Sequence, residues 1–476
     1  MKKLKECENF GELYETIGKE NFATVAYVFT IMLIFVPIVA GIVNCMMLYN
    51  SIYYYGAYEY NYKCIAIWNV VFSLMIIWLG IYVLGRIKIN TRGIKGVLND
   101  IKQKQGWLIW WLMLLAWTVV PVIFSCDIRG AIVGTSQLAS GYISHFYMIA
   151  VLGCVFLASD KKHIDDIMWA FIGIMDILAV VMISFEYDLP FFRLFSAAPG
   201  VSVYTNSNHY GYMITITYMA VSGVFFRCLY DDKIKQVALK KTFCIVSLIV
   251  NALAMVINDT LGSYLAIVFA LLLMPIIWYI RMRKFNVGFI VPFAIIIGFT
   301  LLGYYGFIAT KLGSTIGQSL VIFVEDLFKV KQKAAGFQEA GTGRIALWID
   351  TINKTLERPI VGYGPDVIID RNNQYILLNT PHNEFLECAY FLGIPGLILY
   401  LTGLIALCIS KCKRIKQLSY SELIAAGVVI GYLASSFFGV RKFNTVCYFF
   451  MFLGILMREG DEEKPKENAV KNKKNK

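Results

Sequence analysis

Apolar residues are grouped along the chain in long blocks separated by short polar stretches. Twelve blocks of roughly 20 residues carry almost no charge, and this is the helix length that crosses about 30 Å of hydrocarbon. A membrane barrel is excluded because its strands would alternate apolar and polar residues over roughly ten-residue segments. The pattern predicts an all-α polytopic membrane protein with about 12 transmembrane helices, over residues 23–48, 64–84, 106–125, 142–158, 164–184, 206–225, 242–257, 260–280, 287–307, 384–408, 420–440 and 443–457.

Composition supports this class. Hydrophobic residues form 58% of the 476 residues and charged residues 16%, against about half and a quarter in soluble domains. A soluble multidomain enzyme, a disordered chain and a disulfide-stapled module are therefore excluded. The 11 cysteines include no Cys-x-x-Cys pair and mostly lie in apolar blocks, so neither a disulfide framework nor a metal site is expected.

The distribution of basic residues predicts the orientation. With the N-terminus in the cytoplasm, 31 of the 44 Lys and Arg residues lie in inside segments and 5 in short outside loops, as the positive-inside rule requires. The net charge of +12 is then explained without a nucleic-acid partner. The predicted location is the cytoplasmic membrane, with both termini cytoplasmic. The predicted units are a cytoplasmic N-terminus (1–22), nine spans (23–307), a large extracytoplasmic loop (308–383), three spans (384–457) and a basic disordered tail (458–476).

The loop between the ninth and tenth spans is the main soluble element. Its length far exceeds that of a connector, and such loops usually carry function. Residues Ile316 to Val330 are apolar with scattered charge, which favours an amphipathic helix at the membrane surface. A second helix is predicted from about Thr342 to Glu357, and Pro359 ends it.

Polar residues gather on the predicted outer side, whereas Asp176 and Glu387 are the main acids within the spans. This scarcity counts against ion-coupled transport. The sixth span begins with a polar cluster of Asn206, Asn208 and His209. Such side chains hydrogen-bond sugar hydroxyls, but they are also typical helix caps, and the sequence leaves both roles open.

Three further outer segments contain candidate chemistry. Gly343 and Arg344 open a predicted helix on which Trp348 shares the arginine face. The planar guanidinium of arginine is suited to binding phosphate. A solvent-exposed arginine beside a core tryptophan would give the same sequence pattern. His382 and Asn383 stand where the loop re-enters the membrane. A neutral imidazole there can accept a hydroxyl proton, although a polar residue at a wet boundary is the alternative.

The fourth outer segment is the pair Arg441-Lys442 between the last two predicted spans. It is the only pair of cations in a short outer loop, whereas most Lys and Arg residues lie in the predicted cytoplasmic segments. Either it contributes to a site or its side chains reach lipid headgroups.

Taken together, the chain resembles the O-antigen ligase and O-antigen polymerase superfamily of bacterial membrane glycosyltransferases. The turn at Asn206, Asn208 and Gly211 is similar to one family pattern, and 12 spans with a large loop after the ninth match the family architecture. The main likeness is an ordered set of motifs: Gly343-Arg344-x-x-x-Trp348, Pro359-Ile-Val-Gly362-Tyr-Gly364, His382-Asn383-x-Phe-Leu386 and Gly393-Ile-Pro-Gly396.

The resemblance implies transfer of a glycan from undecaprenyl diphosphate to an acceptor hydroxyl on the outer side of the membrane, without a metal, nucleotide sugar or other cofactor. It implies catalytic roles for His382 and Arg344. The implied partners are the lipid-linked glycan donor, a glycan or glycolipid acceptor, and membrane lipids. The implied substrate-binding residues are Asn206, Asn208, His209, Gly343, Trp348, Asn383 and Arg441.

One departure from the family pattern concerns Thr260-Leu261-Gly262, where many relatives carry Ser-Arg-Gly. The missing arginine leaves Arg441, Lys442, Arg371 or Arg193 as possible substitutes. The motifs support polymerase and ligase equally, and we slightly favour a polymerase or capsular role. Two other classes stay open: a flippase or exporter of lipid-linked oligosaccharide, and a non-catalytic envelope assembly protein.

Overall fold

The structure is a computed structural model of the chain. The part of the chain that the structure describes comprises residues 6–50, 57–134, 139–158, 161–189, 202–204, 206–231, 234–332, 340–341, 343–369, 374, 376–377 and 379–457. Arg193, Arg371 and the predicted tail over 458–476 lie outside these residues.

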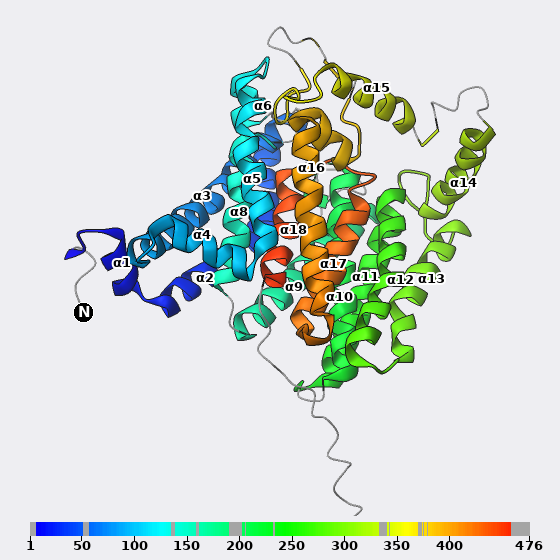
Figure 1. Ribbon diagram of the computed structural model, residues 1–476. Helices are drawn as coiled ribbons and strands as arrows, with labels where there is room; N and C mark the ends of the chain where they lie inside the picture. Colours follow the sequence, from blue (N-terminus) through cyan, green and yellow to red (C-terminus); the bar gives the residue numbers. More distant parts are fainter. Residues whose placement is uncertain are drawn as a thin grey trace, which may run out of the picture.

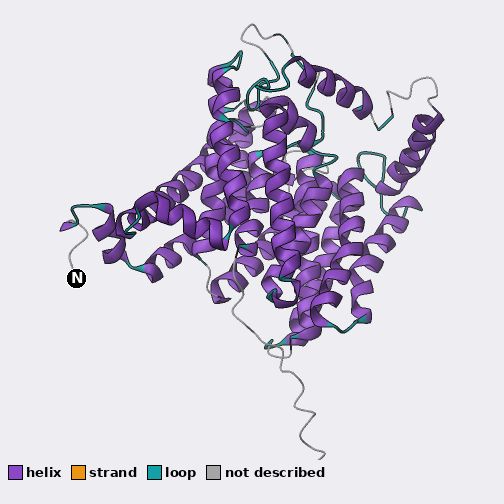
Figure 2. Cartoon of the chain, viewed as in Figure 1, coloured by secondary structure: helices purple, strands orange, loops and turns teal. Residues whose placement is uncertain are grey.

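The described residues form helices and connecting turns without a β-strand (Figures 1 and 2). The α-helices are α1 Phe10–Ile17, α2 Lys19–Asn50, α3 Ala57–Ile89, α4 Gly93–Lys104, α5 Gly106–Trp117, α6 Val119–Ile123, α7 Ile128–Val133, α8 Tyr142–Leu157, α9 Lys161–Glu186, α10 Ser207–Tyr230, α11 Val237–Asn258, α12 Leu261–Met282, α13 Ile290–Tyr304, α14 Ile316–Gln332, α15 Arg344–Glu357, α16 Glu384–Lys413, α17 Tyr420–Ser435 and α18 Phe443–Leu456. Three 3-10 turns join them, η2 Ser202–Tyr204, η3 Val287–Phe289 and η5 Ile415–Gln417. The prediction of an all-helical chain is confirmed for these residues.

Helices long and apolar enough to cross a membrane coincide with predicted spans. Among the described residues there are nine, namely Lys19–Val43, Ile65–Ile89, Gly106–Ile123, His163–Glu186, Ser207–Tyr230, Val237–Asn258, Leu261–Met282, Val287–Tyr304 and Glu384–Lys413. Shorter apolar helices, α8, α17 and α18, occupy the other three predicted positions. These helices and the apolar face described below are those of an integral membrane protein, and the total of 12 spans stays a prediction.

The short helix α18 lies in the centre of the bundle, since all of its residues are buried. A helix that is apolar on every side is typical of such a position. It packs closely against α8 and α17, and α10 in turn packs against α17 and α11. The core is therefore built around α10, α17 and α18, and the first two of these help to position the outer polar cluster.

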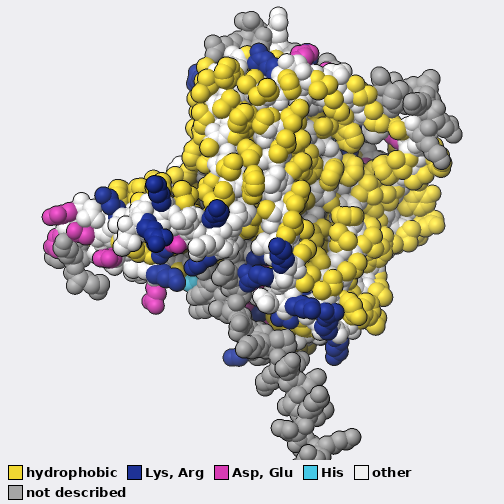
Figure 3. Space-filling model, viewed as in Figure 1, with side chains coloured by type: hydrophobic (Ala, Val, Ile, Leu, Met, Phe, Trp, Pro, Cys, Tyr) yellow, Lys and Arg dark blue, Asp and Glu magenta, His cyan; other side chains and the backbone are white. Residues whose placement is uncertain are grey.

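Hydrophobic side chains cover the broad face of the bundle, and Lys and Arg gather along its lower edge and over the arm formed by α1 to α4 (Figure 3). The loop helices α14 and α15 lie at the upper end (Figure 1). The predicted helix near Thr342 begins at Arg344, and the predicted amphipathic segment is the helix α14. The larger share of Lys and Arg along the lower edge and the arm on this face agrees with the orientation that the sequence predicts.

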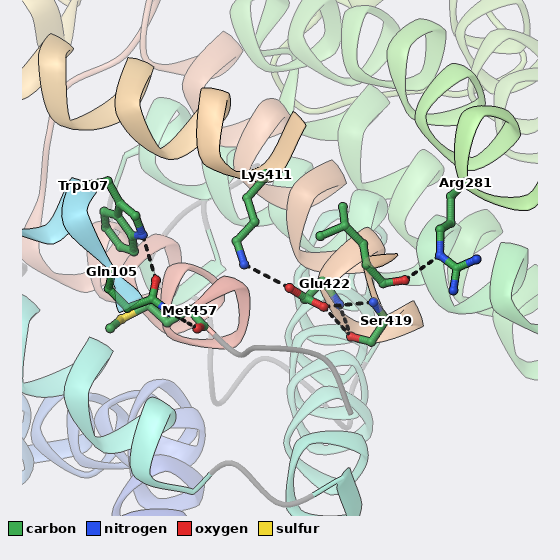
Figure 4. A network of polar contacts seen from close by, with 8 residues as sticks. Gln105, Trp107, Arg281, Lys411, Ser419, Glu422 and Met457 are labelled. Atoms are coloured by element: carbon green, nitrogen blue, oxygen red, sulfur yellow. Dashed lines mark hydrogen bonds and ion pairs between the residues drawn. The ribbon is translucent and has the colours of Figure 1, made fainter. Parts of the chain in front are cut away.

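A polar network joins helices at the lower end (Figure 4). The Lys411 ammonium lies 2.9 Å from the Glu422 carboxylate, which also completes a capping box with Ser419 at the start of α17. Arg281 of α12 donates to the Leu418 carbonyl at 2.8 Å. Because Glu422 is fully buried, its charge has to be paired, and the network fixes the lower ends of α12, α16 and α17.

The helix α16 is interrupted at Gly393, where φ is 71° and ψ is 172°. The predicted tenth span, 384–408, lies within this helix, which is long and apolar enough to cross a membrane; the break inside it is an addition that the sequence did not predict. Segment 359–364 pairs with the break: the Ile394 amide donates to Pro359 O at 2.7 Å and the Gly364 amide to Phe391 O at 3.0 Å. A Cβ at Gly393 would lie 2.0 Å from Ile360 O, so only glycine fits. The first turns of α16 are thereby set apart from the rest of the helix.

Candidate functional site

Arg344 is the first residue of α15, and two glycines shape the turn before it. Gly343 has φ of 80°, a left-handed conformation that glycine adopts without strain. The Gly341 amide donates to Asp326 Oδ2 at 2.8 Å, which ties this turn to α14. Partial burial lowers the pKa of the Arg344 guanidinium, but arginine stays charged at neutral pH. Gly343 therefore shapes the turn that places this permanent cation.

His382 is held between two anchored neighbours. Trp348 donates its indole N–H to Pro381 O at 2.8 Å. On the other side, Asn383 caps α16 by accepting from the amides of Phe385 and Leu386 at 3.0 and 3.1 Å. His382 itself has φ of 49°, which is uncommon for a non-glycine residue and marks a constrained backbone. The capping role of Asn383 is therefore observed directly.

Burial first, and the Arg344 charge second, lower the pKa of His382 to about 4. The imidazole is therefore neutral at physiological pH. Its Nδ1 is buried and makes no hydrogen bond within the described part of the chain. A neutral, constrained imidazole with an unused nitrogen can accept a proton.

The start of α10 lies beside Arg344. Asn206 caps the helix by accepting from the Asn208 amide at 2.8 Å, so capping accounts for this asparagine. Asn208 does not cap; its Oδ1 instead accepts a long hydrogen bond of 3.4 Å from Arg344 Nη2. His209 is buried and lies near His382 and Lys442. The structure thus brings Arg344, His382, Asn208 and His209 together at the outer end of the bundle.

A cavity of about 520 Å³ opens beside Arg344. Its polar lining residues include Asn208, Asp259 and Asp326. Most of the lining is apolar and comes from α12, α14 and α15, with Leu265, Phe323, Leu327, Ile345, Trp348 and Phe438 among the lining residues. The volume falls in the range of small-molecule sites, and a lining that combines charged and apolar side chains matches an amphiphilic ligand.

Arg441 and Lys442 are neighbours in sequence but lie in different surroundings. Arg441 lines a separate internal cavity of about 30 Å³ with Glu384, Glu387 and His145, and its amide donates to Glu387 Oε2 at 3.2 Å. Lys442 is only 3% exposed and acts on His209. The structure therefore does not bring Arg441 into the wall of the large cavity, whereas it brings Lys442 close to the cluster.

Glu384 is a buried acid that our sequence reasoning passed over, although it directly follows His382 and Asn383. The hydroxyls of Tyr212 and Tyr432 both donate to its Oε1 at 2.8 Å. These bonds tie the start of α16 to α10 and α17. The position of Glu384, a charged residue at the start of an apolar block, could have drawn attention to it in the sequence. The two tyrosines that donate to its carboxylate come from distant parts of the chain and could not have been identified in this way.

Comparison with known proteins finds one family. Residues 246–401 match the family model described as O-antigen ligase. The match starts in α11 and ends in α16, so it includes Arg344, His382 and three walls of the large cavity, while Asn208 and Lys442 lie outside it. No curated protein matches the chain.

Proposed function

We propose that the chain, whose residues 246–401 match the family model described as O-antigen ligase, transfers a glycan from undecaprenyl diphosphate to an acceptor hydroxyl at the outer face of the cytoplasmic membrane. The domain supports glycan transfer of the O-antigen ligase or polymerase type. The acceptor is a growing glycan in a polymerase and a glycolipid in a ligase. Of these we favour the polymerase role.

The proximity of Arg344 and His382 is the observation that carries this proposal. Burial first and the nearby guanidinium second lower the pKa of the imidazole to about 4, and Trp348, one helical turn after Arg344, donates to Pro381 O directly before His382. A permanent cation that lines the cavity and a neutral base close to that cation are the two groups that this reaction needs. The apolar lining is suited to a polyprenyl chain, and Arg344 and Asn208 to the diphosphate and first sugar.

In the proposed reaction the acceptor oxygen attacks the anomeric carbon of the donor sugar. The bond between that carbon and the bridging phosphate oxygen breaks, and its electron pair stays on the oxygen of undecaprenyl diphosphate. Arg344 faces the charge that develops there, a type of stabilisation worth several kcal/mol. His382 takes the acceptor proton. Asn208 and His209 contact sugar or phosphate oxygens, and Trp348 fixes the His382 turn.

The test is transfer by the purified protein in liposomes that contain a lipid-linked glycan and a candidate acceptor. We expect a new glycosidic bond and release of one undecaprenyl diphosphate for each glycan transferred. A flippase would move the intact lipid-linked glycan across the bilayer without breaking the bond between the anomeric carbon and the phosphate oxygen. An assembly protein would do neither. Either of those outcomes contradicts the proposal.

The low pKa of His382 predicts an unusual pH profile. Protonation removes the base, so transfer falls as the pH drops through the folded-state pKa. We expect kcat/KM to stay level from neutral pH down to about pH 5 and to fall with an apparent pKa near 4, because this parameter reports the free enzyme. A fall centred near the ordinary histidine value of about 6.5 would show that His382 is not the buried base.

Lys442, rather than Arg441, is the better candidate for a second cation at the diphosphate. We expect Lys442→Gln to lower transfer by about tenfold to a hundredfold, since it removes a buried charge beside the cluster. Arg441→Gln should instead lower the melting temperature, because Glu384 and Glu387 lose a neighbouring cation. Transfer per folded protein measures the difference, and an equal loss in both variants would contradict this assignment.

A further inference from the structure

The helix α4 (Gly93–Lys104) is a second amphipathic element, far from the proposed catalytic site. Ile94, Leu98 and Ile101 follow one another at helical spacing and form one stripe. The first two are 59% and 42% exposed, so the structure leaves this stripe largely uncovered.

Basic residues flank the stripe on both sides. Lys95 and Lys102 lie along one edge and Lys104 along the other by their spacing on the helix, and all three are exposed. The acid Asp100 is turned away from the stripe and lies 3.6 Å from Arg86. An apolar stripe bordered by lysines is the arrangement of helices that lie in the plane of a membrane surface.

The position of α4 in the bundle fits such a surface. Gln105, directly after α4, donates its side-chain amide to Met457 O at 2.6 Å, and Met457 ends α18. Because α18 starts beside Lys442, its end lies at the opposite end of the bundle from the Arg344–His382 cluster. This is the end where Lys and Arg gather (Figure 3).

We propose that α4 lies in the membrane surface at this end and binds anionic phospholipid headgroups. The apolar stripe inserts among the upper acyl carbons, and the three lysines pair with headgroup phosphates. Charge complementarity selects anionic lipid over a zwitterionic one. The proposal does not depend on the glycan-transfer function, since neither the stripe nor its lysines touch that site.

Amide hydrogen exchange of the full-length protein in lipid nanodiscs tests this contact. We expect phosphatidylglycerol to slow exchange in α4 by about tenfold or more relative to pure phosphatidylcholine, because each lysine near an anionic surface adds to binding. The effect should weaken at high salt. The triple variant Lys95→Gln, Lys102→Gln, Lys104→Gln should lose most of the protection while it keeps its helix and its transfer activity.

A matched triple variant, Lys413→Gln, Arg414→Gln and Lys416→Gln, removes three basic residues near the end of α16 and should keep the protection of α4. Equal exchange in the two lipids would overturn the proposal, as would the same loss of protection in both triple variants. Protection that depends on the number of protein copies in each nanodisc, and not on the lipid, would show that a second copy covers the stripe instead.

Discussion

Replacing Arg344 with alanine is expected to lower the rate of glycan transfer by at least about a hundredfold, while the amount of protein in the membrane stays unchanged. The leaving diphosphate gains charge in the transition state, and removal of one fixed donor at such a position costs roughly 2.7–4 kcal/mol in other enzymes. Within the described part of the chain the side chain makes one long hydrogen bond, to Asn208 at 3.4 Å, so its loss should disturb the fold little.

Replacing Arg344 with lysine distinguishes the contribution of positive charge from that of the planar guanidinium geometry. Arginine presents a planar fork that contacts two phosphate oxygens at once, whereas an ammonium is a point charge. We expect Arg344→Lys to keep only a small part of the activity. Arg358→Ala is the matched control, because Arg358 directly follows α15 but contacts Phe124 O and the Tyr363 ring instead of the cavity. Its transfer rate should stay within about threefold of wild type.

Wild-type transfer by purified Arg344→Ala would remove this residue from the mechanism. An equal loss in Arg358→Ala would also contradict the assignment, since it would point to a general effect of charge at the outer end of the bundle.

Replacing His382 with asparagine is expected to lower transfer by about 10²–10⁴, the usual contribution of a general base. Asparagine is the informative substitution because it tolerates a positive φ better than most residues, and His382 has φ of 49°. The turn before α16 is therefore preserved while the proton acceptor is lost. Single-turnover transfer at neutral pH measures the effect, and the melting temperature reports the fold.

His163→Gln is the matched control for this experiment. His163 lies at the start of α9 and stacks on Tyr27 at 4.4 Å, and it has no place in the proposed site. Its replacement should leave transfer within about threefold of wild type. Full activity of His382→Asn would exclude the imidazole as the base.

The apolar blocks predicted much of the fold because span length and lack of charge are local properties of the sequence. They could not predict the break at Gly393, which depends on pairing with Pro359–Gly364, more than 25 residues away. The motifs around Gly362 and Gly393, which looked separate in the sequence, are two sides of one contact. α4 was missed because its apolar stripe is short and sits among charged loop residues.

The candidate site was predicted in part. Arg344 and His382 are close together, as the sequence interpretation required, because their positions follow from helix starts that are readable in the sequence. Asn206 and Asn383 carry out capping, which spacing alone could not distinguish from substrate binding. Arg441 and Lys442 lie in a short connection between α17 and α18. Because this connection has no helical periodicity, the direction of its side chains cannot be predicted from residue spacing. Only the structure separates their surroundings.

The most direct test of the site is the position of the diphosphate in an experimental structure of the protein bound to undecaprenyl diphosphate. We expect the two phosphates to lie against the Arg344 guanidinium, within reach of His382 and Lys442, and the polyprenyl chain to lie against the apolar side chains of α12 and α14. Phosphates at the lower end of the bundle, or beside Arg441 and away from Arg344, would contradict this expectation.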